Sequence, residues 1–66
     1  MNTSAIIKIA RKHVDNNVPM ASSARVCLAD AIERYDSGDF DSAAMWARKS
    51  LAYSVGVLHK DYQRVA

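Results

Sequence analysis

Cysteine, proline and glycine are scarce in this sequence, and each shortage excludes something. The single cysteine, Cys27, allows no disulfide within the chain, so the fold does not depend on an oxidising compartment. Pro19 is the only proline and Gly38 the only glycine before residue 56, so few positions favour the end of a helix. No apolar run approaches the roughly 20 residues of a membrane span, and Met1–Ala10 lacks the long apolar region of a signal peptide. We therefore expect a soluble cytoplasmic protein that makes no use of a membrane.

Groups that carry catalysis or bind metals are also few. Several acidic side chains surround residues 36–41, where they suit helix caps and solvated turns, and no loop has the spacing of a calcium site. His13, Cys27 and His59 offer one potential ligand in each expected helix, whereas structural zinc sites usually take close pairs of ligands. We therefore expect no enzyme activity, no bound metal and no cofactor.

Length and composition predict one small globular domain over residues 1–66. A chain of 66 residues is near the lower limit at which one hydrophobic core holds a fold. Half of the residues are hydrophobic and 24% are charged, which is typical of a globular protein rather than a disordered one. The net charge is only +2. Because no strand pattern interrupts the helical periodicity, the predicted fold class is all-α.

The clearest local signal is a helical hairpin turn at Gly38, Asp39 and Phe40. Gly38 follows a run of helical periodicity, and glycine enters the left-handed conformation that commonly ends helices. Asp39 is a favourable N-cap for a following helix, because its carboxylate can accept from free amides of the first turn. Phe40 can fold back onto the preceding helix near Tyr35.

Apolar periodicity predicts helices over about residues 3–16, 20–37 and 40–64, arranged as an antiparallel three-helix bundle. A helical hairpin forms two of the helices, and the shorter N-terminal helix packs against it. Asn16–Pro19 separates the first two helices. The predicted inner stripe of the third helix is Phe40, Ala43, Ala44, Ala47, Leu51, Val55, Leu58 and Tyr62. Gly56 costs about 1 kcal/mol inside a helix, so a kink is also compatible with this pattern.

The segment from Gly38 to Ala43, followed by Ala47, Ser50 and Leu51, resembles the second half of a tetratricopeptide repeat. It is also similar to the helical hairpin of microtubule-interacting-and-transport domains. Both resemblances imply binding to other proteins. The match covers about a third of the chain and departs from the tetratricopeptide pattern at Asp30 and Tyr35. In size and in its lack of catalytic groups, the chain resembles small accessory proteins of temperate bacteriophages.

A stripe of Trp46, Tyr53 and Val57 on the third helix has two interpretations. It packs against the first helix inside the bundle, or it is an exposed aromatic patch of the kind found at protein–protein interfaces. With Leu58 and Tyr62, the stripe makes up our candidate partner-binding surface. The favoured function is a non-catalytic protein–protein interaction module, such as an adaptor, inhibitor or phage-encoded accessory protein.

The lengths of the predicted helices favour a homodimer through the third helix. A helix over 40–64 spans about 36 Å, whereas the second helix spans about 27 Å. About two turns of the third helix, with Leu58 and Tyr62, then lack cover within the chain. A second copy would bury them in a symmetric contact.

The alternative function is a weak nucleic-acid-binding regulator that uses the basic first helix. Lys8, Arg11 and Lys12 lie on its polar side. The helix after the hairpin instead begins with Asp39 and Asp41, whose charge repels phosphate, and basic residues elsewhere are few. Nucleic acid is therefore the less favoured partner.

Binding to random-sequence duplex DNA should accordingly be weak and should vanish near physiological salt. Only about three basic groups can contact one backbone face together, so the salt dependence should be shallow. Fluorescence anisotropy over a salt series measures this, and sub-micromolar affinity at about 0.15 M salt would reverse the order of the two functions.

Overall fold

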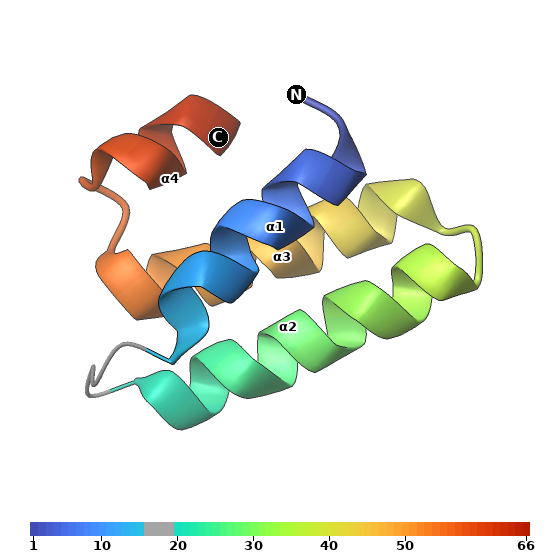
Figure 1. The fold of residues 1–66 in the computed structure, drawn as a ribbon, viewed down its shortest axis with the longest axis horizontal. Coiled ribbons are helices and arrows are strands. Elements are labelled where there is room, and N and C mark those ends of the chain that lie inside the picture. The colour runs from blue at the N-terminus through green and yellow to red at the C-terminus, as the bar shows by residue number, and fades with distance from the viewer. Residues whose placement is uncertain (16–19) are drawn as a thin grey trace.

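The computed structural model describes residues 1–15 and 20–66, and the described residues are helical without strands. Four helices occur in them: α1 (Thr3–Val14), α2 (Ala21–Asp36), α3 (Phe40–Val55) and α4 (Lys60–Val65) (Figure 1). The all-α class is confirmed. The break predicted at Asn16–Pro19 lies outside the described residues. No helix in the described part of the chain has the length and apolar character needed to cross a membrane.

A tight turn joins α2 to α3 where the sequence analysis places it. Gly38 has a φ of +85°, its N–H donates to the Tyr35 carbonyl, and the N–H of Asp39 donates to the Arg34 carbonyl at 2.9 Å. The Asp39 carboxylate accepts from the N–H of Ser42 at 3.2 Å and so caps α3. The rings of Tyr35 and Phe40 lie 5.1 Å apart, although Phe40 remains half exposed.

The contact between α2 and α3 is made by very small side chains. These are fully buried, and they allow the two backbones to approach closely. The hydroxyl of Ser50 donates to the carbonyl of Ala24 across this contact at 2.8 Å. The fully buried small residues of the two helices are Ala24, Ala31, Ala43, Ala47 and Ser50.

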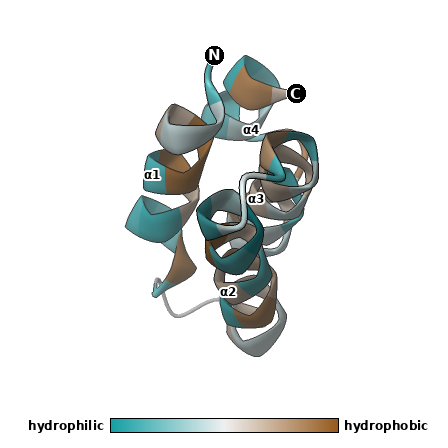
Figure 2. Ribbon diagram, turned by 90° about the vertical axis from the view of Figure 1, so that its right-hand side faces the viewer, coloured by the Kyte–Doolittle hydropathy of each residue, from teal (hydrophilic) through white to brown (hydrophobic). Residues whose placement is uncertain are grey.

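Helix α1 packs across α2 and α3 through its apolar side (Figure 2). Ile6, Ile7, Ala10 and Val14 enter the core, where Leu28 and Leu51 face them as the larger side chains of the other two helices. Ile9 is only partly buried, because it lies at the edge of this apolar side. An Asn2 side chain accepting from the N–H of Ala5 caps the start of α1.

The predicted continuous helix over 40–64 is wrong. Helix α3 ends at Val55, and Gly56 then adopts φ +86° and ψ 157°, a region open almost only to glycine. The chain turns back, and α4 packs against α3, where Val65 is buried and Tyr62 packs against the core. The guanidinium of Arg48 donates to the Val65 carbonyl at 2.6 Å and holds the last turn of α4 in place.

This break changes two other expectations. The chain has four helices in its described part rather than the three of the predicted bundle. Helices α2 and α3 each contain 16 residues, so α3 has no overhang beyond α2. The homodimer prediction therefore loses the length argument on which it was based. Leu58, predicted to lie on the inner stripe, is 91% exposed in the turn between α3 and α4.

Replacing Gly56 with alanine should lower the free energy of unfolding by about 1–3 kcal/mol, because a side chain strains this backbone conformation. A Cβ there meets no neighbouring atom, so the cost comes from the backbone alone. Urea unfolding followed by circular dichroism measures the change, with Gly38→Ala as a comparison at the other positive φ. An increase in stability and helicity in Gly56→Ala would mean that the continuous helix is preferred.

Candidate functional site

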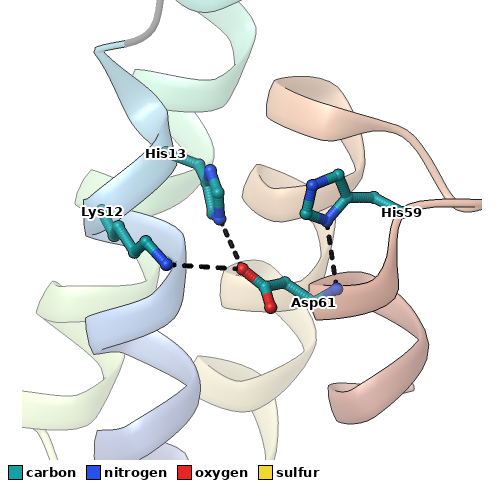
Figure 3. Close-up of polar contacts among 4 residues, drawn as sticks. All are labelled: Lys12, His13, His59 and Asp61. Atoms are coloured by element: carbon teal, nitrogen blue, oxygen red, sulfur yellow. Dashed lines mark hydrogen bonds and ion pairs between the residues drawn. The ribbon is translucent and has the colours of Figure 1, made fainter.

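A buried contact between an imidazole and a carboxylate joins the first helix to the last (Figure 3). His13 lies in the last turn of α1, and Asp61 lies in the first turn of α4. The His13 Nε2 lies 2.7 Å from the Asp61 Oδ2, and each side chain is only 10% exposed. The two groups are 48 positions apart in the sequence, so the contact depends on the reversal of the chain after α3.

His59 completes a cluster of three side chains with His13 and Asp61. It precedes α4 as its N-cap, and its Nδ1 accepts from the N–H of Asp61 at 3.0 Å. Its ring meets the His13 ring edge to face, with 5.3 Å between centroids and an interplanar angle of 69°. One nitrogen or oxygen from each of the three side chains lies within 4.8 Å of the others. His59 was predicted to lie within a continuous third helix, and the break at Gly56 places it here instead.

The surroundings of Asp61 favour its ionised form. The hydrogen bond with His13 is the main cause that lowers the pKa of Asp61 below its ordinary value of 3.8, and desolvation opposes it. Lys12 adds a smaller attraction, with its Nζ 3.8 Å from the Asp61 Oδ2. A carboxylate that is charged at neutral pH therefore lies against two imidazoles.

A second surface feature lies at the same end of the molecule, in the turn that leads into α4. Leu58 and Val57 are 91% and 52% exposed, although the backbone that carries them is held by hydrogen bonds. The Gln63 side chain donates to the Val57 carbonyl at 2.5 Å, and the N–H of His59 donates to the Gly56 carbonyl at 3.2 Å. The turn therefore presents two apolar side chains to solvent in a defined position.

Tyr53, near the end of α3, is a further exposed apolar side chain at this end of the molecule. It is 41% exposed and lines a shallow groove of about 320 Å³ together with Val26 and Cys27. Burial raises the pKa of the Cys27 thiol, so this side chain acts as a small apolar group and not as a reactive thiolate. We name the exposed apolar side chains Val26, Tyr53, Val57 and Leu58 the apolar end; it lies where α2 begins and α3 ends, at the left of Figure 1.

The other candidate residues of the sequence analysis are distributed differently. Trp46 and Tyr62 are partly buried against the core, and Trp46 also lies beneath two cations, Arg34 and Lys49, at 5.6 and 4.7 Å from its ring centroid. The predicted stripe of Trp46, Tyr53 and Val57 is thus divided between core and surface. The basic residues of the alternative function, Lys8, Arg11 and Lys12, are all exposed on α1.

The sequence analysis missed Asp61. A local signal for a new helix was present, because Asp61 follows Gly56 closely and an acidic side chain is favourable in the first turn of a helix. That pattern matters only if Gly56 ends the preceding helix. Comparison with known proteins adds nothing to the site, since no family model, curated protein or solved structure matches this chain.

Asp61→Asn should destabilise the protein at neutral pH, because it removes a carboxylate whose pKa is lowered in the folded state. That stabilisation is complete above the ordinary carboxyl pKa and is lost as the pH falls through the lowered native value. The difference from the parent should therefore narrow as the pH falls below the ordinary carboxyl pKa of 3.8, as measured by urea unfolding over a pH series. Glu33→Gln, at an exposed position on α2, is the matched control. A difference that stays constant as the pH falls below that value would contradict the assignment.

Proposed function

We propose that this chain is a non-catalytic protein–protein interaction module that binds another protein through its apolar end. The observation that carries the proposal is Leu58, which is 91% exposed on a turn held by hydrogen bonds. A large apolar side chain fixed in solvent gains free energy when a partner covers it, since burying a leucine contributes about 1.5–3 kcal/mol before association costs. Fixing the turn beforehand reduces the entropy lost on binding.

The surroundings of Leu58 are suited to a contact with another protein. Tyr53 supplies an aromatic side chain with a polar tip, a residue type enriched at interface centres. The groove beside it gives a partner side chain a concave place to pack, and Val26 forms part of its wall. A small adaptor, inhibitor or accessory protein fits this arrangement.

The hydroxyl groups in the core support a role without catalysis. Ser50 and Ser54 are buried, and both donate to backbone carbonyls within 3 Å. They satisfy polar groups in the core, and a nucleophile needs instead an adjacent base and access to substrate. In this proposal α1, α2 and α3 form the bundle proper, and α4 is an added helix that closes its end.

The partner can be a second copy of the chain. The homodimer would then form through the apolar end and not along the third helix as first predicted. The alternative function, nucleic-acid regulation through Lys8, Arg11 and Lys12, is favoured only by the exposure of these side chains on α1. The ion pair between Lys12 and Asp61 offsets part of that charge.

Leu58→Asp should weaken partner binding at least about tenfold, because it replaces the buried contact with a charge. The measurement is affinity capture from the native host with quantitative mass spectrometry, with and without nuclease. Met45→Asp is the matched control, since Met45 is 47% exposed on α3 away from the apolar end. Both positions are exposed, so both variants should melt near the parent temperature.

Protein partners that resist nuclease, persist with Met45→Asp and disappear with Leu58→Asp are the expected result. Equal recovery with both variants would contradict the proposal, and nuclease-sensitive recovery would favour the nucleic-acid alternative. Sedimentation equilibrium of the parent and of Leu58→Asp tests the homodimer in the same series, since only the parent should self-associate.

A further inference from the structure

The cluster of His13, His59 and Asp61 has the composition of a metal-binding site. The contact between His13 and Asp61 joins α1 to α4. His59 adds a second imidazole to the same place, where its ring faces that of His13 (Figure 3). Two imidazoles and an ionised carboxylate, with donor atoms within 4.8 Å of one another, converge from α1 and the start of α4.

We propose that these three side chains bind a divalent transition-metal ion, with zinc the best fit. Imidazole nitrogens and a carboxylate oxygen are a usual zinc donor set, and two nitrogen donors disfavour magnesium and calcium. Three protein ligands leave a fourth position for water, as in zinc sites that are not closed by protein. Metal binding is separate from the proposed contact with another protein and needs none of the apolar end.

The separations require only small movements. Donors around tetrahedral zinc at about 2.0 Å lie roughly 3.3 Å from one another. His13 Nε2 and Asp61 Oδ2, now 2.7 Å apart, would separate slightly as the ion replaces the proton between them, and His59 would move inward. His59 is the N-cap of α4, and its ring can move by rotation about its own side-chain bonds without moving α1 or α3.

Binding has a cost at His59. Its Nδ1 accepts from the N–H of Asp61, so in the neutral ring the proton is on Nε2. If His59 binds the metal through Nδ1, it loses the hydrogen bond from the N–H of Asp61. If it binds through Nε2, the ring proton must first leave Nε2. His59 is therefore the weakest of the three ligands, and we expect weaker binding than at a preformed site.

The bound ion would join α1 to α4 in addition to the ion pair. A chain this small gains much from such a cross-link, because its core is limited. Since the unfolded chain does not hold the three ligands together, zinc should stabilise the folded state by mass action.

Isothermal titration calorimetry of the untagged protein with zinc chloride measures the affinity and stoichiometry of the site, with magnesium as the control ion. The decisive variant is His59→Asn, because asparagine is a favourable N-cap and keeps an acceptor for the N–H of Asp61 while removing the imidazole. Asp61→Asn and His13→Gln remove the other two ligands. Cys27→Ser is the matched control, since it removes a soft ligand that is not part of the cluster.

The expected result is one zinc ion per chain, a rise in melting temperature with zinc but not with magnesium, and affinity reduced at least about tenfold in His59→Asn. Cys27→Ser should bind as the parent does. Cobalt(II) should give the visible absorption of a four-coordinate nitrogen–oxygen site in the parent and lose it in His59→Asn. Failure of the parent to bind zinc, or equal affinity in the parent and in His59→Asn, would overturn the proposal even if Asp61→Asn and His13→Gln do not fold.

Discussion

The positions of the other helices depend on the close contact between α2 and α3. Alanines and one serine line it, so the two backbones approach until the Ser50 hydroxyl reaches the carbonyl of Ala24. Ile6 of α1 and Leu51 of α3 are the largest fully buried side chains, and they belong to the same core as the alanines of this contact. The position of α1 follows, and with it the position of His13. A hairpin with bulkier side chains would spread and leave α1 without a continuous surface to cover.

A single backbone conformation then decides what happens at the end of α3. Gly56 turns the chain back, so α4 lies against α3 and the last turn of α1 meets the first turn of α4. The same turn produces two different surfaces. Its outer side exposes Leu58, and its inner side carries His59 and Asp61 toward His13. The turn after α3 therefore positions both Leu58 and the polar cluster, although their chemistry is unrelated.

Helical periodicity was sufficient to predict most of this fold, because burial on one side of a helix leaves a repeating pattern. It located α1 and α2 and the buried alanines of α3. It failed at Gly56, since a glycine inside a helix costs only about 1 kcal/mol and the apolar spacing continues through Leu58 and Tyr62. The pattern there is compatible with both a long helix and a broken one.

The candidate site was less predictable than the fold, for a related reason. His13 and Asp61 are brought together only when the chain reverses, so no local spacing records their contact. His59 was recognised as a potential ligand but was assigned to a continuous third helix, because its position depends on where α3 ends. The exposure of Leu58 was misjudged through the same error. One backbone angle thus accounts for most of what sequence reasoning missed.

The shortness of α4 has a consequence for how the native state fluctuates. A helix of six residues makes too few hydrogen bonds to persist alone in water. It is stabilised by the burial of Val65, by the hydrogen bond from Arg48 and by the His13–Asp61 contact. These contacts break together when α4 lifts away, while the α2–α3 contact is untouched. The backbone amides of α4 should therefore exchange with solvent as one cooperative unit, at a lower free energy than those of α3. We therefore expect two levels of stability, a higher one for α2 and α3 and a lower one for α4.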